Sequence, residues 1–161
     1  MKEIVVVDQN WGIGKDGTLL VHLPGDLKYF KDQTLGKVVV MGRETLQSLP
    51  GAKPLKDRTN IVLSRNKDFT ADCTVCHSTD ELFKTLEDYD TEEVVIAGGE
   101  SVYKQLSPYC DRYLVTKIYK EFQADKHFEN LDEREDLSIV WESPMQVEKD
   151  ILYKFIEYRR K

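Results

Sequence analysis

The stretch VVVMGRET at residues 38–45 is the most informative segment of this chain. A short apolar run is followed by a glycine, an arginine and a threonine, and then by LQSL at 46–49. This order predicts a buried strand, a tight turn and the first turn of a helix. Helix N-termini expose unpaired N–H groups with partial positive charge, so they bind phosphates, and Arg43 adds a planar set of donors. The alternative is an ordinary strand–helix junction with a solvated arginine.

The same pattern recurs in EVVIAGGESVY at residues 93–103. An apolar strand again meets glycines, Gly98 and Gly99, and then a helical stretch. Glycine permits positive φ and close approach of the backbone. Two such units in one chain predict an α/β sheet that binds a ligand at the carboxyl ends of its strands. The alternative is that the glycines only let the helix pack close to the sheet.

Length and composition indicate one globular domain, residues 1–161. The chain has 40% hydrophobic and 32% charged residues, and its longest apolar runs are strand-sized. The start, MKEIVVVD, is typical of a buried strand rather than an export signal. The net charge of −6 disfavours nucleic acid, so we expect neither nucleic acid nor a membrane as a partner. An anionic ligand would then need cations gathered locally; candidates are Lys31, Arg43, Arg58 and Arg65.

The cysteine pattern indicates reduced thiols. An odd count of three without an export signal is typical of a cytoplasmic protein. Cys73 and Cys76 form a C-x-x-C followed by His77, but a zinc site needs a second pair of ligands, which the chain does not offer nearby. Incidental thiols in a strand are the favoured interpretation, and we expect no metal.

Strands alternate with helices through residue 107, which favours a largely parallel sheet. Strands are expected near 3–8, 37–42, 59–64, 73–77, 93–97, 111–119 and 151–159, with another near 137–142. Helices are expected near 25–34, 43–49, 78–88 and 99–107, the third with a capping box at 78–81. The charged stretch 125–136 shows no clear helix, and an antiparallel hairpin at the sheet edge is the simplest account of the last segments.

The segment GIGKDG at residues 12–17 matches G-x-G-x-x-G. A dinucleotide fingerprint needs these glycines to open a helix directly after a strand, whereas the following residues 18–24 look extended. A glycine-rich loop that acts as a lid over a site is the better interpretation.

Asp26 should lie in the first turn of the helix that begins near Pro24. It can share the apolar side marked by Leu23, Leu27 and Phe30. An acid at this position can simply complement the helix dipole. A carboxylate that faces an apolar pocket would instead pair with a ligand donor or hold a proton at raised pKa.

Taken together, these segments resemble the dihydrofolate reductase family over nearly the whole chain, from Ile4 to about Phe155. The order and spacing of the segments make the resemblance specific, although each alone is weak. In chain order they are LPGDL at 23–27 with Phe30, VMGRET at 40–45, RTNIVLSR at 58–65, IAGGESVY at 96–103, YLVT at 113–116 and DKHF at 125–128. The family implies a three-layer α/β fold with a central, mostly parallel eight-stranded sheet, an antiparallel C-terminal edge strand and about four flanking helices.

The resemblance implies NADPH-dependent reduction of 7,8-dihydrofolate to tetrahydrofolate by hydride transfer with protonation at N5, which serves one-carbon metabolism. Asp26 would be the ionisable group at the pterin, and Thr116 would support it through a hydrogen bond; these are the expected catalytic residues. Arg58 would pair with the glutamate α-carboxylate. Partners would be dihydrofolate and antifolate inhibitors, and we expect a monomer. The remaining substrate-binding residues would be Val5, Val6, Leu27, Phe30, Leu49 and Leu55.

For the cofactor, the resemblance implies that two glycine turns hold the NADPH phosphates and that Ser64 and Arg65 recognise the 2′-phosphate. The nicotinamide would lie against Val6, Ile13 and Leu19. Closure of the loop at 12–20 would exclude water. The full expected cofactor set is Val6, Ile13, Gly14, Leu19, Gly42, Arg43, Thr45, Leu63, Ser64, Arg65, Ala97, Gly98, Gly99, Ser101, Val102 and Tyr103.

One departure from the family pattern stands at position 21. The family usually has a tryptophan there, which packs on the pocket and hydrogen-bonds a water near the pterin, and Val21 has no N–H donor to replace it. Activity is expected to survive because Asp26, Thr116 and both glycine turns remain; the departure bears on the water network and on inhibitor affinity.

Three rival functions remain open. The related reductase of riboflavin biosynthesis shares the fold and NADPH, but Asp26 and Arg58 argue against it. A catalytically inactive folate- or nucleotide-binding module would bind ligand without turnover. A purely structural interaction domain would leave the paired glycine junctions without a purpose.

Overall fold

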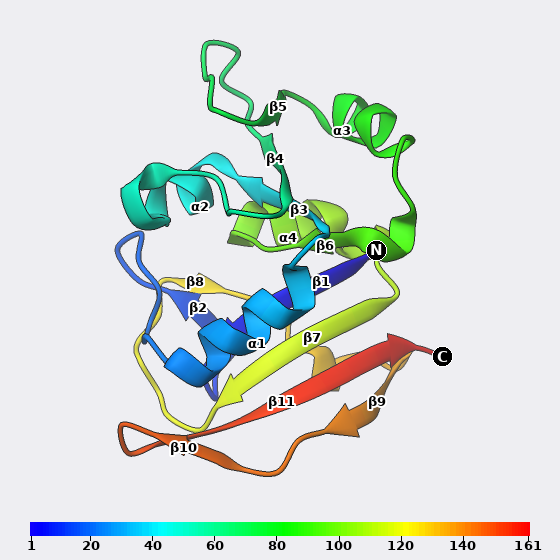
Figure 1. Cartoon of the computed structure of the whole chain (residues 1–161). Helices are drawn as coiled ribbons and strands as arrows, with labels where there is room; N and C mark the ends of the chain where they lie inside the picture. Colours follow the sequence, from blue (N-terminus) through cyan, green and yellow to red (C-terminus); the bar gives the residue numbers. More distant parts are fainter.

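The computed structural model describes residues 1–161 as a twisted central sheet with helices on both faces (Figure 1). β1 (Lys2–Val7) lies at the centre, because it is an apolar strand paired on both sides and buried on both faces. Its parallel neighbours are β7 (Arg112–Ile118) and β6 (Val94–Ile96). The sheet continues from β6 in parallel order through β3 (Val38–Gly42), β4 (Thr59–Leu63) and β5 (Thr74–Cys76).

Beyond β7 the sheet becomes antiparallel. β11 (Ile151–Arg160) runs antiparallel to β7 along seven residue pairs. β9 (Leu137–Glu142) pairs with the later half of β11 and β10 (Gln146–Glu148) with the earlier half, so the two short strands share the outermost position. The expected mostly parallel sheet with an antiparallel C-terminal strand is confirmed. β10 escaped the sequence analysis because it has only three residues.

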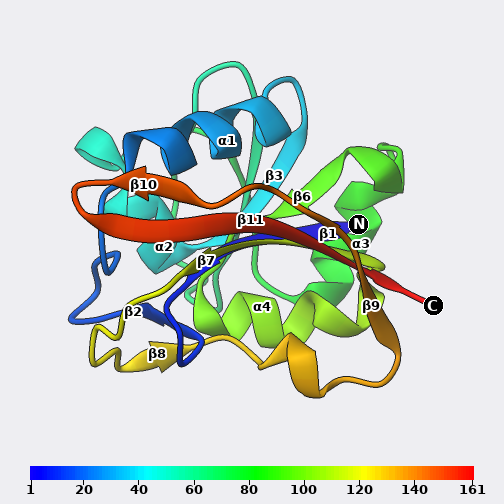
Figure 2. The same ribbon diagram turned by 90° about the horizontal axis from the view of Figure 1, so that it is seen from below.

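Helices cover the two faces separately, which makes three layers (Figure 2). α1 (Pro24–Thr34) and α2 (Arg43–Ser48) pack on one face, and α3 (Thr79–Leu86) and α4 (Glu100–Leu106) on the other. All four α-helices were predicted, each within two residues of its observed ends. Four short 3₁₀ helices complete the list: η1 (Pro50–Ala52), η2 (Thr91–Glu93), η3 (Ser107–Tyr109) and η4 (Leu131–Glu133). No helix combines the length and the apolar character that a membrane span requires.

The side chains of β1 alternate between these two layers, as a strand requires. Ile4 packs toward Tyr29 and Phe30 of α1. Val5 and Val7 belong instead to the largest core cluster, under α3 and α4. The same strand therefore builds two separate environments, one on each face.

A second, two-stranded sheet forms where the sequence predicted only a glycine-rich loop. β2 (Gly12–Gly14) pairs with β8 (Lys126–His127), and Asp16 and Gly17, both at positive φ, make the turn that follows β2. These strands have three and two residues, too few for a periodic pattern. The Asp8 carboxylate ties the segment to the main sheet by accepting hydrogen bonds from the N–H groups of Gly12 at 2.8 Å and Phe122 at 3.1 Å. The G-x-G-x-x-G segment thus opens no helix.

Glu3 is an exception within the core, because it is a fully buried carboxyl on the α4 face. Neither of its oxygens has a hydrogen-bond partner in the protein. Burial raises the pKa of Glu3 to about 9 from its ordinary value of 4.5. The folded protein therefore binds a proton at Glu3 that the unfolded chain releases over the range between these two values.

The Glu3→Gln variant should consequently be more stable than the parent protein above pH 5. Because the folded pKa is raised, parental stability falls as pH rises from about 5 to 9, by roughly 1 kcal/mol per pH unit, and the variant removes this slope. Urea unfolding at pH 5, 7 and 9 measures the effect, with the exposed Glu121→Gln as control. Equal pH slopes in parent and variant would contradict the assignment.

Candidate active site

Asp26 lies in the first turn of α1, which begins at Pro24. This helix packs on the sheet over β1 and β7. The Thr116 hydroxyl of β7 donates a hydrogen bond to Asp26 Oδ1 at 2.6 Å. Thr116 can reach Asp26 because it pairs in register with Val6 of β1 and so points to the α1 face. Burial raises the pKa of Asp26 to about 6 although the Thr116 bond lowers it. A half-buried carboxyl that exchanges its proton near neutral pH is suited to acid–base chemistry.

A second carboxylate, Glu148 of β10, stands close to Asp26. Its Oε1 accepts hydrogen bonds from the Gly25 N–H at 2.7 Å and from the Tyr153 hydroxyl at 2.5 Å. The negative charge of Glu148 also raises the pKa of Asp26. A Cβ at position 25 would press on the Glu148 carboxylate and the Tyr153 hydroxyl, so a larger residue there would displace these two side-chain ends. The sequence analysis missed this group because no local pattern links β10 to α1.

A narrow apolar cleft opens at Asp26. Several of the residues predicted to contact the substrate or the nicotinamide line this cleft. One of them, Leu27, is 41% exposed because its side chain faces the cleft rather than the packed core. The cleft is lined by Val6, Ile13, Leu19, Leu20, Val21, Leu23, Asp26 and Leu27. Asp26 is the one charged group in this apolar lining.

Farther along the same face, the structure distinguishes two neighbouring residues of β1. Ile4 lies with Phe30 of α1, whereas the side chain of Val5, an expected substrate residue, lies in the core on the opposite face. Ile4 is therefore the β1 residue whose side chain lies on this face beside Phe30, a placement that strand alternation alone predicts.

The outer end of this face carries the other expected substrate residues. Leu49 and Leu55 pack together against the cluster around α2. Arg58 lies next to the end of α1, where its Nε donates to Thr34 Oγ1 at 3.1 Å and its Nη1 to the Lys56 carbonyl at 3.0 Å. These two bonds fix the plane of the guanidinium and leave Nη2 available to a ligand.

The two glycine junctions lie side by side at the carboxyl ends of β3 and β6. The Gly42 N–H donates to the Gly98 carbonyl at 2.8 Å. Gly98 has φ +112°, and a Cβ there would sit 3.1 Å from the Tyr103 hydroxyl, so this position requires glycine. Gly98 and Gly99 are joined by a cis peptide bond. The structure thus brings together the starts of α2 and α4, as the sequence predicted, and both present free backbone N–H groups.

The other residues predicted to bind the cofactor differ in exposure and in whether they contact these junctions. Thr45 lies against Gly99, with its Oγ1 3.5 Å from the place of a Cβ. Ser101 is exposed on α4. The side chains of Leu63, Val102 and Tyr103 belong to the main core. Ala97 follows β6 and packs against the clusters under α1 and α2. Arg43 is half-buried and forms no ion pair within the protein, which leaves its charge free for an anion.

Ser64 and Arg65 follow β4, which is the next strand along the same edge. Ser64 is buried and Arg65 is exposed. His77, at the end of β5, places its Nδ1 2.9 Å from the Ser64 carbonyl. The sequence analysis considered His77 only beside the C-x-x-C, yet it belongs to this edge. Cys76 lies inside β5 with its thiol 3.6 Å from Thr85 Oγ1, and both Cys73 and Cys76 are free thiols.

Comparison with known proteins agrees with this geometry. A family model described as dihydrofolate reductase matches residues 1–160. The dihydrofolate reductase of Bacillus subtilis (strain 168) is 38% identical over 160 residues, covering 98% of this chain and 93% of the relative. That of Staphylococcus haemolyticus is 40% identical over 139 residues, or 84% and 81% of the two chains. A solved structure of dihydrofolate reductase from Enterococcus faecalis, complexed with NADP(H) and RAB-propyl, superposes with a TM-score of 0.88 at 34% identity, over 99% of this chain and 95% of that one.

The contact between Gly25 and Glu148 leads to a prediction about Asp26. Replacing Glu148 with glutamine removes a negative charge that favours the protonated form, so the pKa of Asp26 should fall by up to about one unit. Carbon NMR of the Asp26 carboxyl across pH 4–8 measures this shift. Glu135→Gln, an exposed change on another element, serves as control, and an unchanged or raised pKa in Glu148→Gln would refute the coupling.

Proposed function

This chain belongs to the dihydrofolate reductase family and reduces dihydrofolate with NADPH, and we propose that Asp26, held by Thr116, carries the proton chemistry of that reaction. The observation that supports this assignment is the half-buried Asp26 carboxyl in an apolar cleft, with a pKa raised to about 6. A dihydropterin bound there would donate from its N3 and 2-amino groups to the carboxylate. Asp26 would thereby favour protonation at N5 of the ring.

The chain's residues fit NADPH on structural grounds. Gly42 and Gly98 bring two backbone turns into hydrogen-bond contact, and a Cβ at Gly42 would sit 3.1 Å from Val102, so the cradle has no room for larger residues. Arg43 adds an unpaired cation beside it. When bound, NADPH supplies the hydride. The N–H groups of the two junctions would hold its diphosphate, and Ser64 and Arg65 would receive the 2′-phosphate.

The remaining residues would position the two ligands and shield the reacting atoms from water. Val6, Ile13 and Leu19 would pack against the nicotinamide, and the segment around β2 would cover the cleft and exclude water. Leu27 and Phe30, with Ile4 behind them, would hold the pterin and the aminobenzoyl group. Leu49 and Leu55 would extend this apolar surface outward, and Arg58 would bind the glutamate α-carboxylate through its free Nη2.

We further propose that residues 1–161 act as one domain, as a monomer in the cytoplasm that binds antifolate inhibitors at the Asp26 cleft. The single sheet that runs through the chain supports the first point. Three free cysteines support a reducing compartment, because thiols persist there.

Asp26→Asn tests the proton assignment. The variant should lose about 10²-fold or more in hydride transfer, and its rate should no longer fall as pH rises through about 6. Since burial opposes ionisation of Asp26, the variant should also be about 3 kcal/mol more stable at pH 7. Stopped-flow NADPH oxidation and urea unfolding measure both, with Asp32→Asn on the exposed side of α1 as control. An Asn variant with a full rate would return Asp26 to a helix-dipole role.

Arg65→Ala tests recognition of the 2′-phosphate. Loss of a charge-assisted contact should reduce kcat/KM with NADPH by about tenfold and leave kcat/KM with NADH unchanged. Steady-state kinetics with each cofactor measure the ratio, and Lys67→Ala provides an exposed cation as control. An unchanged ratio would exclude Arg65 from the cofactor site.

Val21→Trp tests the departure at position 21. Val21 lines the cleft with Asp26 and packs against the cluster of Leu23 and Tyr153. A tryptophan would add apolar contact and an N–H donor, so binding of a diaminopyrimidine antifolate should tighten by roughly threefold or more. Fluorescence titration measures the dissociation constant, with Val21→Leu to separate size from the donor. Identical constants and turnover in all three proteins would show that position 21 lies outside the site.

A further inference from the structure

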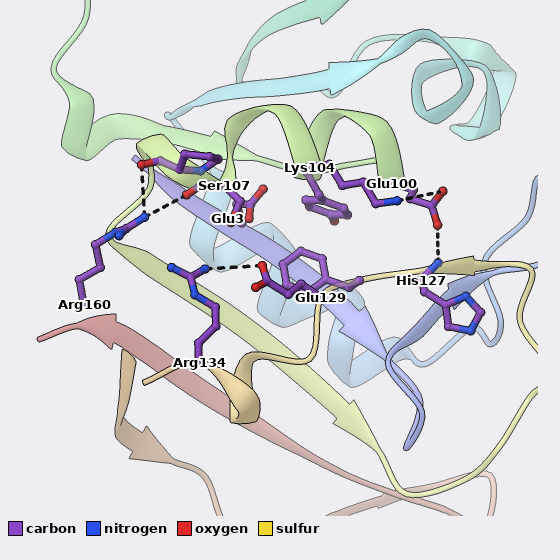
Figure 3. Close-up of a pocket in the computed structure, with 11 residues that line it drawn as sticks. Glu3, Glu100, Lys104, Ser107, His127, Glu129, Arg134 and Arg160 are labelled. Carbon is purple, nitrogen blue, oxygen red and sulfur yellow. Dashed lines mark hydrogen bonds and ion pairs between the residues drawn. The ribbon is translucent and has the colours of Figure 1, made fainter. Parts of the chain in front are cut away.

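A second cavity lies on the opposite face of the sheet from Asp26, between α4 and the segment that follows β8 (Figure 3). Its volume is about 350 Å³, which falls within the range of small-molecule sites. Side chains from β1, α4, η3, β8 and the end of β11 contribute to it. They are Glu3, Glu100, Tyr103, Lys104, Ser107, Pro108, His127, Phe128, Glu129, Arg134 and Arg160.

Glu3 lies at the inner wall of this cavity and is its one unpartnered charged group (Figure 3). Its side chain is fully buried, and both carboxyl oxygens lack a hydrogen bond. Ser107 lies beside it and lowers its pKa, but not in hydrogen-bond geometry. Buried polar groups are nearly always paired, so a carboxyl at a cavity wall with neither oxygen hydrogen-bonded indicates a ligand that displaces the side chains covering it and, once the carboxyl is ionised, donates to both oxygens.

The cations around the cavity are already neutralised. Arg134 binds Asp136 through two bonds of 2.9 and 2.7 Å and lies 3.7 Å from Glu129. Arg160 reaches the same Asp136 at 3.2 Å, and three backbone carbonyls also accept from it. Lys104 lies 4.0 Å from Glu100. An anion would therefore have to compete with these carboxylates, whereas a cation would meet in Glu3 a carboxyl that is in no ion pair and can ionise on binding.

The walls also suit an organic cation. Tyr103 and Phe128 line the cavity and pack edge to face, with ring centroids 4.9 Å apart. Aromatic groups attract cations, and a carboxylate binds a planar fork of N–H donors through both oxygens. We propose that this cavity is a binding site for a small organic cation whose amidinium or guanidinium head donates to both oxygens of Glu3. The site is separate from the reductase cleft.

Binding of such a cation must be coupled to proton release. Glu3 holds its proton at neutral pH in the free protein, since burial and the charge of Glu129 raise its pKa while Arg134 lowers it. The ion pair needs the ionised carboxyl, so each cation bound should displace about one proton, and affinity should rise about tenfold per pH unit below pH 9. The other titratable groups that face the cavity are Glu100, Tyr103, Lys104, His127, Glu129, Arg134 and Arg160.

Benzamidinium is a suitable probe, and the full chain is titrated with it by calorimetry at pH 6.5, 7.5 and 8.5. The titration uses the Asp26→Asn background, because Asp26 is a second carboxyl beside a cavity and could bind the same head group. Buffers with different ionisation enthalpies report the proton released, and amide NMR locates binding. We expect tightening with pH, release of one proton, and shifts at Ser107, His127 and Glu129.

Variants and analogues decide the outcome. Glu3→Gln in the same background should weaken benzamidinium at least tenfold, while the exposed Glu121→Gln should not. Neutral benzamide should bind more weakly and without the pH dependence. Preference for benzamide or benzoate, binding that ignores Glu3, or no binding would each overturn the proposal. The proton count in the protein with native Glu3 tests it even if Glu3→Gln folds poorly.

Discussion

Strand alternation along β1 is the constraint on which the other features depend. One short backbone segment sends Ile4 and Val6 into the layer under α1 and sends Glu3, Val5 and Val7 into the layer under α4. Each layer holds one carboxyl beside a cavity, the half-buried Asp26 on one face and the fully buried Glu3 on the other. The two carboxyls differ in support: Asp26 has Thr116 as a donor and Glu148 nearby, whereas Glu3 has no bonded partner. Tyr103 of α4 ties the Glu3 layer to the sheet, because its ring lines the Glu3 cavity while its hydroxyl donates to the backbone carbonyl of Ile4 at 2.6 Å.

The parallel order of β6, β3 and β4 explains how an acidic protein can hold a polyanionic cofactor. Parallel strands end at a common edge, so the segments that follow them become neighbours although they are far apart in the sequence. Gly98, Gly42 and Ser64 follow the three strands in that order. Backbone N–H groups and two arginines then provide local positive potential without changing the net charge of −6.

Local patterns predicted the parts of the site that depend on nearest neighbours in the chain. The glycine junctions, the start of α1 and the position of Asp26 on it were all readable, because turn chemistry and helix signals act over a few residues. The place of Glu148 in the site could not be predicted from the sequence, since its partner Gly25 lies 123 residues away and the contact depends on how β10 pairs with β11. β2 and β8 were missed for a different reason, as two or three residues carry no periodicity. The placement of Ile4 and Val5, by contrast, was available from alternation alone.

The shared outer position of β9 and β10 has a consequence for the behaviour of the protein at high concentration. This edge carries several exposed apolar side chains, among them Val140, Trp141 and Val147. A continuous strand with such residues would offer a template on which a second molecule could add its own strand. Pro144 interrupts the edge between β9 and β10, and proline has no N–H to give to a ladder. The break limits each free stretch to six residues or fewer, which protects the sheet against intermolecular extension and so against aggregation.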